Sequence, residues 1–499
     1  MYHRGMAAPP LPDHRALIAT SDWVAGRPWL AEEAAIWQRE LPPVRARLER
    51  EAALLARPRV WIDTVATLAT TGWRMASAAA PDAPLQILTA AAGAFGLPVG
   101  PSQSGAGVRT AEELVRAGGP AYVKLGQFIS SAEGLLPREW VDAFAWCRDR
   151  VPPVPGHVAV ARIRQELGER FDELIDLEPE AFAAASIGQV HRARLQDGTD
   201  VVVKIRRPDL RRQFAQDVEA LALVAAAAHR INASIRVANL PAFVELFAQL
   251  ALLELDFRLE ALNMVELGAC FEDAGLEYCD FPRPIPGMVT ERVLVMEAVP
   301  GVPFTAATDT YGEALDGDRL LDLAIKGVLE GTLAYGRFHG DLHAGNVLVS
   351  GGDRFSLVDF GICGRLTATE RAGLVRFLLG FAAMDAERQL EALDAFGALP
   401  PEADRAAMAV ALQQVIDDLP PGLTVDALGE TLGGVLRTLA AHGFQAPKEL
   451  VLFFKNVLYL SAFTAAIAPE ADLLAQIGPQ MAYFSGKYGD ELLAMAVDG

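Results

Sequence analysis

Cysteine is scarce in this sequence, and the few cysteines present show no functional spacing. Cys147, Cys270, Cys279 and Cys363 form neither a CxxC pair nor a set spaced like metal ligands. This pattern excludes a disulfide framework and a cysteine-based zinc site, and it suits a reducing compartment.

Positive charge is also in short supply. The chain carries a formal charge of −20, and only six of its 44 basic residues are lysine. Nucleic acid is therefore excluded as the main partner, because phosphate binding needs a basic face. The same charge argues against simple electrostatic attachment to an anionic membrane. The few lysines are informative where they fall inside motifs, because a compact ammonium differs chemically from a guanidinium.

The sequence lacks a signal peptide pattern and a long apolar run. The N-terminus has no basic start followed by an apolar stretch, so no secretory signal is predicted. No uninterrupted run reaches the roughly 18 apolar residues of a spanning helix. The nearest candidate, residues 450–468, is interrupted by Lys455 and Asn456. This favours a buried amphipathic helix, with a membrane-lying helix as the second interpretation. We expect a cytoplasmic protein whose membrane contact, if any, is peripheral.

At 499 residues the chain is too long for one ordinary core, so two or three structural units are expected. Apolar spacing predicts helices over residues 31–55 and 61–80, and the Gly, Pro and Ser content of residues 96–107 predicts a linker. Thr110 with Glu113 reads as a capping box that opens the next helix.

The most informative stretch is residues 338–364, which reads FHGDLHAGNVLVSGGDRFSLVDFGICG. It predicts a short strand over residues 347–350, a Gly-Gly turn and a second strand over residues 355–358. Such a hairpin brings the residues that flank it on either side to the same edge.

Three polar residues in this stretch have the order that phosphoryl transfer from ATP requires. Asp341 is followed five residues later by Asn346 and eighteen residues later by Asp359. The first carboxylate would accept a hydroxyl proton, and the amide and second carboxylate would hold Mg²⁺. We expect His339 to brace this loop, and His343 to neutralise phosphate charge where protein kinases use a lysine.

A second candidate region lies upstream, where the pattern changes to strands around an Asp197–Gly198 turn. The segment before it resembles a phosphate-covering loop of pattern G-x-G-x-x-G-x-V, with two of its three glycines replaced by alanine. Fourteen residues after Val190, Lys204 ends the run VVVK, where a lysine would grip the α and β phosphates. The residues expected to contact the nucleotide here are Ala183, Ala184, Ala185, Ser186, Gly188, Val190 and Lys204.

Two lysines and two glutamates suggest two ion pairs. A phosphate-gripping lysine needs a carboxylate to hold its amine, and Glu254 and Glu260 both lie in a helical stretch downstream. Six residues apart on one helix they are about 240° apart, so both cannot face the same lysine. The second lysine is Lys124, and the residues alone leave open which glutamate each lysine meets.

Two further segments complete the pattern. The run at residues 292–304 reads as a buried strand and a Pro-Gly turn, the hinge of a kinase-like fold. There Met296 would wall the adenine pocket, and the backbone from Glu297 to Val299 would bind the base. After Gly361 the chain turns helical almost at once, with Thr367 and Glu370 as a capping box. No long activation segment or Ala-Pro-Glu anchor follows, so the peptide platform of protein kinases is missing.

The combined motifs resemble the UbiB (AarF) family of atypical protein-kinase-like proteins, the group of the coenzyme Q biosynthesis kinases. The resemblance covers residues 110–479 and rests on KLGQ at 124–127, AAASIGQVHRA at 183–193, VVVKIRRP ending at 208, the Glu254/Asp256 pair, HGDLHAGN and DFG. It implies that a KxGQ helix with Lys124, Gly126 and Gln127 lies over the active-site cleft as a regulatory lid. It also implies that Lys124 pairs with Glu254 and Asp256, while Glu260 partners Lys204.

The sequence departs from the family at the catalytic loop. Family members more often have Ala-Asp-Pro-His-Pro-Gly-Asn, whereas this chain has Gly340, Leu342 and Ala344. The loop also resembles that of small-molecule kinases of the aminoglycoside and choline type. The pair of C-terminal membrane spans found in some family members is not visible.

We therefore predict an α+β, bilobal protein-kinase-like fold. Its predicted parts are a helical extension and linker (1–109), a KxGQ helical segment (110–155), an N-lobe (156–298) and a mostly helical C-lobe (299–499). The predicted catalytic residues are Asp341, Lys204 and Glu260, with ATP and Mg²⁺ as cofactors and Asn346 and Asp359 as metal ligands.

Three functions fit this pattern. The first is an ATPase or a kinase for a small-molecule or lipid ligand resembling a quinone precursor, and it is the one we favour. The second is a phosphotransferase of a known type, either a conventional protein kinase or an aminoglycoside- or choline-type kinase. The third is a nucleotide-gated scaffold with little catalysis.

Overall fold

The structure, a computed structural model, describes residues 8–57, 83–94, 105–130, 136–149, 151–231, 239–399, 403–417, 435, 438–439, 444, 447–471 and 473–497. The helix expected over residues 61–80 and most of the linker expected over 96–107 lie outside the described residues. The chain divides into two compact units. The N-unit comprises Asp22–Val265 and Pro282–Val299, and the C-unit comprises Met1–Ser21, Glu266–Phe281 and Pro300–Gly499.

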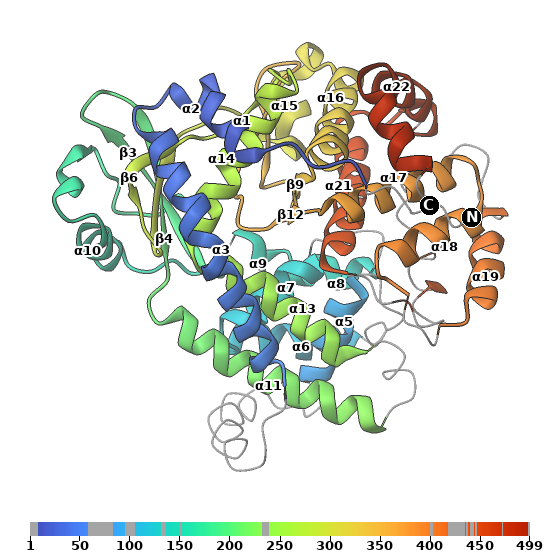
Figure 1. The fold of residues 1–499 in the computed structure, drawn as a ribbon. Coiled ribbons are helices and arrows are strands. Elements are labelled where there is room, and N and C mark those ends of the chain that lie inside the picture. Colours follow the sequence, from blue (N-terminus) through green and yellow to red (C-terminus); the bar gives the residue numbers. More distant parts are fainter. Residues whose placement is uncertain are drawn as a thin grey trace. The chain divides into compact units, whose positions relative to one another are not determined.

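The N-unit is built on an antiparallel sheet with strand order β1-β3-β4-β7-β6, and β2 pairs with β3 at one end (Figure 1). Its strands are β1 (Leu174–Ile175), β2 (Ala183–Ala184), β3 (Gly188–Leu195), β4 (Asp200–Arg206), β6 (Pro284–Val289) and β7 (Val293–Glu297). The predicted Asp197–Gly198 hairpin is confirmed, since β3 and β4 pair in register from Arg194 opposite Asp200. Gly198 has a φ of 89°, a conformation that costs glycine little.

The alternation of side chains along β4 separates a core face from a polar face. Val201, Val203 and Ile205 pack into an apolar cluster with helix α10 (Gly156–Leu167). Because successive side chains of a strand point to opposite faces, Lys204 and Arg206 emerge on the other face. This alternation places the predicted phosphate-gripping lysine away from the core.

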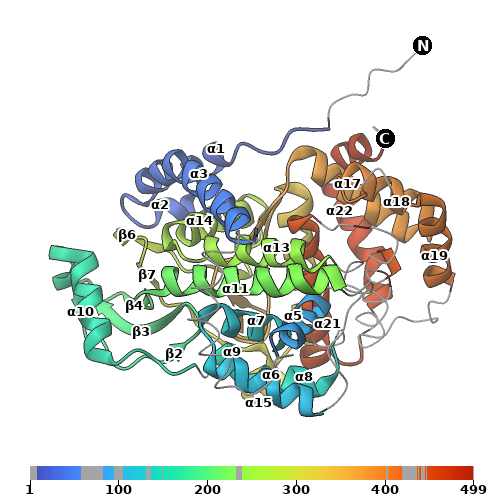
Figure 2. The same ribbon diagram turned by 90° about the horizontal axis from the view of Figure 1, so that it is seen from below.

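Helices make up the rest of the N-unit, and α11 and α13 run side by side (Figure 2). They are α2 (Asp22–Ala25), α3 (Leu30–Leu55), α5 (Ala83–Ala94), α6 (Gly105–Ala117), α7 (Pro120–Ser130), α8 (Arg138–Phe144), α9 (Trp146–Asp149), η1 (Gly168–Glu173), α11 (Leu210–Ile231), α13 (Leu240–Leu253) and the start of α14 (Phe257–Asp273). The predicted capping box at Thr110 is wrong, because α6 begins at Gly105 and Thr110 lies in its second turn. The Thr-x-x-Glu pattern also occurs within amphipathic helices, and the residues before Thr110 continue this one.

The strands of the C-unit form two small sheets. One has the order β5-β11-β10-β8 and the other pairs β12 with β9. Their bounds are β5 (Cys279–Asp280), β8 (Val302–Pro303), β9 (Arg337–His339), β10 (Val347–Val349), β11 (Phe355–Leu357) and β12 (Cys363–Arg365). The predicted hairpin is present, with each strand one residue shorter than expected, and Val347 lies opposite Leu357.

Helices complete the C-unit. They are α1 (His14–Thr20), η2 (Phe304–Ala306), α15 (Ala307–Tyr311), η3 (Gly312–Ala314), α16 (Gly317–Leu329), the π-helical turn η4 (Glu330–Ala334), α17 (Ala368–Ala382), α18 (Ala386–Ala395), α19 (Arg405–Asp417), α21 (Lys448–Ile467) and α22 (Leu473–Val497). The predicted capping box of α17 is confirmed: the Thr367 side chain accepts from the Glu370 N–H, and the Glu370 carboxylate accepts from the Thr367 N–H.

Helix α21 packs a row of buried apolar side chains within the C-unit. Phe453 and Phe463 meet Phe338 and Phe304 edge to face. Among the described residues, α21 is the helix whose length and apolarity match a membrane span, and 61% of its most apolar window is buried in the structure. This burial agrees with the expected buried amphipathic helix.

Candidate functional site

The N-unit holds Lys204 in a buried ion pair. Its Nζ lies 2.8 Å from Oε1 of Glu260, and these residues are only 6% and 1% exposed. Glu260 lies in the first turn of α14, and the Lys204 ammonium also sits 5.4 Å from the ring centre of Phe257. The Lys204 amine is thus held on the polar face of β4 by a carboxylate and an aromatic ring.

A second buried pair joins Lys124 of α7 to Glu254. Lys124 Nζ lies 2.7 Å from Glu254 Oε2, and both side chains are nearly inaccessible to water. The structure thus has the pairing that the family resemblance implies. The geometric reason given from sequence is wrong, however, because Glu254 follows the end of α13 and Glu260 belongs to α14. The two glutamates diverge because the chain breaks between two helices.

Asp256 has a different partner from the one implied by the resemblance. Its carboxylate accepts from the Arg258 guanidinium at 2.7 and 2.9 Å and from the Arg258 N–H at 3.2 Å. Asp256 is therefore the residue that caps the start of α14, and Glu254 is the one that binds Lys124.

The KxGQ helix α7 is bonded to the alanine-rich loop through Gln127. The Gln127 amide donates to the Cys147 carbonyl at 3.0 Å, and its oxygen accepts from the Ser186 hydroxyl at 2.9 Å. Glycine is required at position 126, because a Cβ there would lie 2.5 Å from the Cys147 sulfur. The position of α7 is therefore held by three different contacts, which involve Lys124, Gly126 and Gln127.

The alanine-rich loop is a tight reversal between β2 and β3. Ala183 pairs with Val190 across the two strands, and the Ala185 N–H donates to the Gly188 carbonyl at 2.8 Å. A Cβ on Gly188 would lie 2.7 Å from the Ile205 carbonyl oxygen, so glycine is needed at this position. Ala184 is buried within the loop, whereas Ala183 is exposed.

The predicted adenine segment ends β7. Met296 is buried, and the N–H groups of Glu297 and Ala298 donate to the carbonyls of Arg283 and Asp200. The prediction that a backbone N–H of this segment binds a base therefore rests on Val299.

In the C-unit, the β10–β11 hairpin brings Asn346 and Asp359 to one edge. The Val358 N–H donates to the Asn346 carbonyl at 3.0 Å, and the Asn346 amide donates to the Asp341 carbonyl at 2.9 Å. Asp359 has a φ of 59°, a left-handed conformation that aspartate tolerates better than most residues.

These residues fit a magnesium ion bound together with a nucleotide. The described part of the chain holds no group of three or more His, Cys, Asp or Glu that could bind a metal alone. Mg²⁺ is usually held by one or two protein oxygens, with phosphate and water oxygens completing its octahedron. One carboxylate and one amide, from Asp359 and Asn346, match that requirement.

His339 braces the predicted catalytic loop through two hydrogen bonds. Its Nδ1 accepts from the Asp341 N–H at 3.1 Å, and its Nε2 lies 3.1 Å from the Val358 carbonyl. Burial lowers the pKa of His339, which favours a neutral ring that donates from Nε2. This geometry suits a positioning group rather than one that gains and loses a proton.

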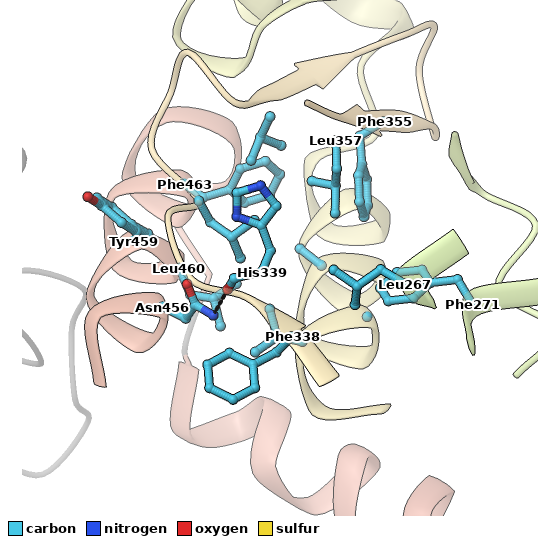
Figure 3. A pocket seen from close by; sticks show the side chains of 15 residues that line it. Leu267, Phe271, Phe338, His339, Phe355, Leu357, Asn456, Tyr459, Leu460 and Phe463 are labelled. Atoms are coloured by element: carbon cyan, nitrogen blue, oxygen red, sulfur yellow. Dashed lines mark hydrogen bonds between the residues drawn. The ribbon is translucent and has the colours of Figure 1, made fainter. Parts of the chain in front are cut away.

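Three residues that sequence reasoning did not assign to the site come from α21. The Lys455 ammonium lies 2.8 Å from Asp341 Oδ1, and the Tyr459 hydroxyl donates to the same oxygen at 3.1 Å. The Asn456 amide donates to the His339 carbonyl (Figure 3). The sequence feature that could have revealed these residues is the polar pair Lys455–Asn456, which interrupts an apolar run.

A small cavity of about 40 Å³ lies beside these residues, with His339, Asn456 and Tyr459 on its wall (Figure 3). The rest of its lining is mostly apolar, including Leu267, Phe271, Val347, Leu357 and Phe463. A space of this size holds no more than a few water molecules. The predicted catalytic loop is therefore packed against mostly apolar side chains and does not border a large ligand pocket here.

Known proteins share this sequence pattern. Residues 147–393 match the ABC1 atypical kinase-like domain. The chain is 33% identical over 379 residues to Uncharacterized protein Rv0647c of Mycobacterium tuberculosis, covering 74% of this chain and 76% of the relative. It is 30% identical over 372 residues to Probable protein kinase UbiB of Pseudomonas paraeruginosa (72% and 68% covered). A protein of the same name from Pseudomonas putida is 31% identical over 371 residues (73% and 68%).

Among solved structures, the chain is similar to one described as the complex structure of Rv3197-erythromycin from Mycobacterium tuberculosis. The sequence identity is 21% and the TM-score is 0.43, with 71% of this chain and 94% of that chain covered. The domain match confirms the predicted α+β, bilobal kinase-like fold class. The chain therefore belongs to the UbiB (ABC1) family of atypical kinase-like proteins.

Proposed function

We propose that this protein binds Mg-ATP and acts as an atypical kinase or ATPase on a small-molecule or lipid ligand. Following the family resemblance, its role is in isoprenoid-quinone or other lipid metabolism, in the cytoplasm with peripheral contact to the membrane. Proteins are not its substrates in trans.

The observation that carries the proposal is the buried Lys204–Glu260 pair. A buried ion pair is weak evidence for stability, because desolvation offsets much of the Coulomb attraction. Lysine is also rare in this chain, so a lysine held on the polar face of β4 at 6% exposure calls for another reason. Gripping the α and β phosphates, with Glu260 orienting the amine, is the role that a lysine at this strand position has in kinases.

The C-unit supplies the remaining chemistry in this proposal. Asn346 and Asp359 hold Mg²⁺, which when bound neutralises charge on the phosphate oxygens. Asp341 orients the acceptor hydroxyl or water and takes its proton. His339 keeps Asp341 in place through the hydrogen bond to its N–H.

Two features support a small or lipidic acceptor over a peptide. Helix α17 begins at Ala368, only seven residues after Gly361, which leaves no room for a long activation segment. Within the N-unit, α7 is fixed by the Lys124–Glu254 pair and by the Gln127–Ser186 hydrogen bond to the alanine-rich loop. A helix bonded to the loop that would cover the phosphates limits how a protein chain can approach.

A second candidate function is a nucleotide-gated scaffold with little catalysis. The observation that favours it is the same link from α7 to the loop, because a nucleotide that moved the loop would also pull on Gln127. Turnover distinguishes the two functions, since a scaffold binds nucleotide without hydrolysing or transferring its phosphate.

The test is Mg-ATP turnover of Asp359→Asn protein, measured with and without liposomes that contain a quinone-precursor mimic. The matched control is Asp353→Asn, because Asp353 is exposed on the same hairpin. We expect Asp359→Asn to lower turnover by roughly 10³-fold or more, because it removes a carboxylate from the metal. The control should match the wild-type protein.

Three results would each redirect the proposal. Unchanged turnover in Asp359→Asn would overturn the metal assignment. Phosphorylation of a peptide library in trans at ordinary kinase rates would favour a conventional protein kinase. Nucleotide binding by the wild-type protein without turnover under any of these conditions would favour the scaffold.

A further inference from the structure

Helix α21 presents three polar side chains to the catalytic loop from consecutive turns. Lys455 and Tyr459, four residues apart on one helix face, both meet Asp341 Oδ1, at 2.8 and 3.1 Å. Asn456, which is fully buried, donates to the carbonyl of His339. One helix from the far end of the chain therefore contacts the loop both at its main chain and at its catalytic carboxylate.

The two carboxylate oxygens of Asp341 have different neighbours. Oδ1 accepts from an ammonium and from a phenol hydroxyl, whereas His343 Nε2 lies 3.9 Å from Oδ2. With Oδ1 already accepting two hydrogen bonds, its carboxylate plane is fixed. Oδ2 is then the oxygen that we assign to the acceptor's proton.

A plain structural ion pair is the ordinary explanation of such a contact, and two observations count against it. Lys455 directly follows the apolar run of residues 450–454 in α21 and its side chain is only 11% exposed, so an ammonium there is costly without a partner. Lys448 on the same helix pairs with its own neighbour Glu449 at 3.5 Å, and both lie at the start of the helix. Lys455 instead meets Asp341, the carboxylate that the proposed function assigns to the acceptor's proton.

We propose that Lys455 has two roles: it neutralises phosphate charge in the site, and it positions Asp341. In protein kinases, phosphate charge is neutralised by a lysine two residues after the catalytic aspartate. In this chain His343 stands at that position, and by this inference Lys455 rather than His343 neutralises the phosphate charge. The inference rests on the proposed function and adds a residue to it. An acceptor oxygen hydrogen-bonded to Asp341 is also the atom that attacks the γ-phosphorus, so an ammonium 2.8 Å from Asp341 lies within reach of the transferring group.

The step balances as an ordinary phosphoryl transfer. The acceptor oxygen, from a hydroxyl or water, forms a bond to the γ-phosphorus while the bond from that phosphorus to the β–γ bridging oxygen breaks. The electron pair leaves with ADP, and the acceptor's proton passes to Asp341 Oδ2. Lys455 keeps its proton throughout and offsets the negative charge that the phosphate oxygens carry.

The experiment compares the full-length variants Lys455→Met, Lys455→Arg and Tyr459→Phe. Lys448→Met is the matched control, because it removes an equally sheltered lysine from the same helix. Three quantities are measured: kcat for Mg-ATP, KM for Mg-ATP, and the ratio of ATP to ADP affinity. The affinity ratio needs no turnover and reports directly on a contact with the γ-phosphate.

For Lys455→Met we expect kcat to fall by roughly 10²–10³-fold with KM changed by less than about threefold. The preference for ATP over ADP should shrink by about tenfold or more. Lys455→Arg should recover part of each loss, Tyr459→Phe should lose about threefold to tenfold, and Lys448→Met should match the wild-type protein.

The outcomes separate this inference from the proposed function. If the wild-type protein turns over ATP and Lys455→Met equals it in kcat and in ATP preference, the inference fails and the function stands. Faster turnover in Lys455→Met would mean that the pair restrains Asp341, which also overturns the inference. A wild-type protein that binds no nucleotide would overturn the proposed function, and Lys455 would lose its role with it.

Discussion

The N-unit and the C-unit each hold a lysine 2.8 Å from a carboxylate, and the two pairs differ in how visible they are in the sequence. Lys204 and Glu260 are 56 residues apart; Lys204 ends a kinase-like motif, and Glu260 lies in the helical stretch where a carboxylate partner is expected. Lys455 and Asp341 are 114 residues apart, and Lys455 lies on a helix that reads only as apolar. Motifs thus reveal a pair when both partners have recognisable neighbours, and miss it when one partner is delivered by packing.

The two pairs also differ in burial. The side chains of Lys204 and Glu260 are 7% and 1% exposed, against 11% and 15% for Lys455 and Asp341. Breaking a fully buried pair leaves an uncompensated charge, whereas a partly exposed pair is screened by water. The N-unit pair should therefore control folding as well as nucleotide binding, and the C-unit pair should control mainly the chemistry.

The largest effect on stability and nucleotide binding is expected when Lys204 is removed. We expect Lys204→Met to destabilise the protein by about 3–5 kcal/mol, because Glu260 is left charged in a dry site, and to abolish ATP binding. The double variant Lys204→Met/Glu260→Gln should regain most of the stability without regaining ATP binding. Chemical denaturation and an ATP titration measure the two effects separately.

The control for that prediction is Lys326→Met, which removes a partly exposed helix pair with Asp322, whose side chains are 22% and 25% exposed. It should cost no more than about 1 kcal/mol and leave ATP binding unchanged. ATP binding by the Lys204→Met/Glu260→Gln protein at wild-type affinity would contradict a phosphate-gripping role for Lys204.

The second buried pair of the N-unit provides an internal comparison. Lys124→Met should also destabilise the protein by about 3–5 kcal/mol, since Glu254 is only 4% exposed. Lys124→Met/Glu254→Gln should fold and still bind ATP within about threefold of wild type, because this pair fixes α7 rather than the phosphates. If ATP binding in this double variant were lost as in the Lys204 variants, the two pairs would share one role.

The C-unit should respond to acid through a partly buried histidine, His14. Burial and the neighbouring Arg337 lower the pKa of His14 to about 4, from an ordinary value of 6.5. Between these values the unfolded chain binds the proton and the folded chain does not, so stability falls as pH drops from 6.5 towards 4. The loss should reach about 2 kcal/mol at pH 5 relative to pH 8.

Denaturant midpoints measured from pH 8 to pH 4.5 test this expectation. His14→Gln should flatten the profile over that window, and His157→Gln should not, because His157 is exposed. Glu266, whose pKa is lowered to about 2 by Arg365 and Arg337 against the opposing effect of burial, adds its own loss only below about pH 4.5. A profile unchanged by His14→Gln would contradict the assignment.

The smallest expected effect concerns the alanine-rich loop. Restoring glycine in Ala183→Gly or Ala185→Gly should loosen the reversal between β2 and β3 and change the ratio of ATP to ADP affinity by a few fold. Stability should fall by no more than about 1 kcal/mol. Isothermal titrations with the two nucleotides, alongside an autophosphorylation assay, check the change. Identical ratios in wild type and both variants would mean that the alanines do not tune nucleotide choice.

Much of the fold was predictable because its signals are local. The hairpin that joins β3 to β4, the hairpin flanked by Asn346 and Asp359 and the capping box at Thr367 each depend on residues a few positions apart. Turn chemistry and side-chain alternation act over that range, so the sequence specifies them directly. The capping box expected at Thr110 failed for the converse reason, since a short pattern does not reveal that the helix already began at Gly105.

By itself, then, the sequence determined which residue types stand in which order: the two lysines of the N-unit, the Asp341, Asn346 and Asp359 series, and the family to which they point. Only the tertiary structure decided which of these side chains contact one another. It placed Glu260 against Lys204, Glu254 against Lys124, and Lys455 against Asp341. The physical reason is that an ion pair forms where packed helices and strands bring two charges within about 3 Å, and that packing depends on residues far apart in the chain.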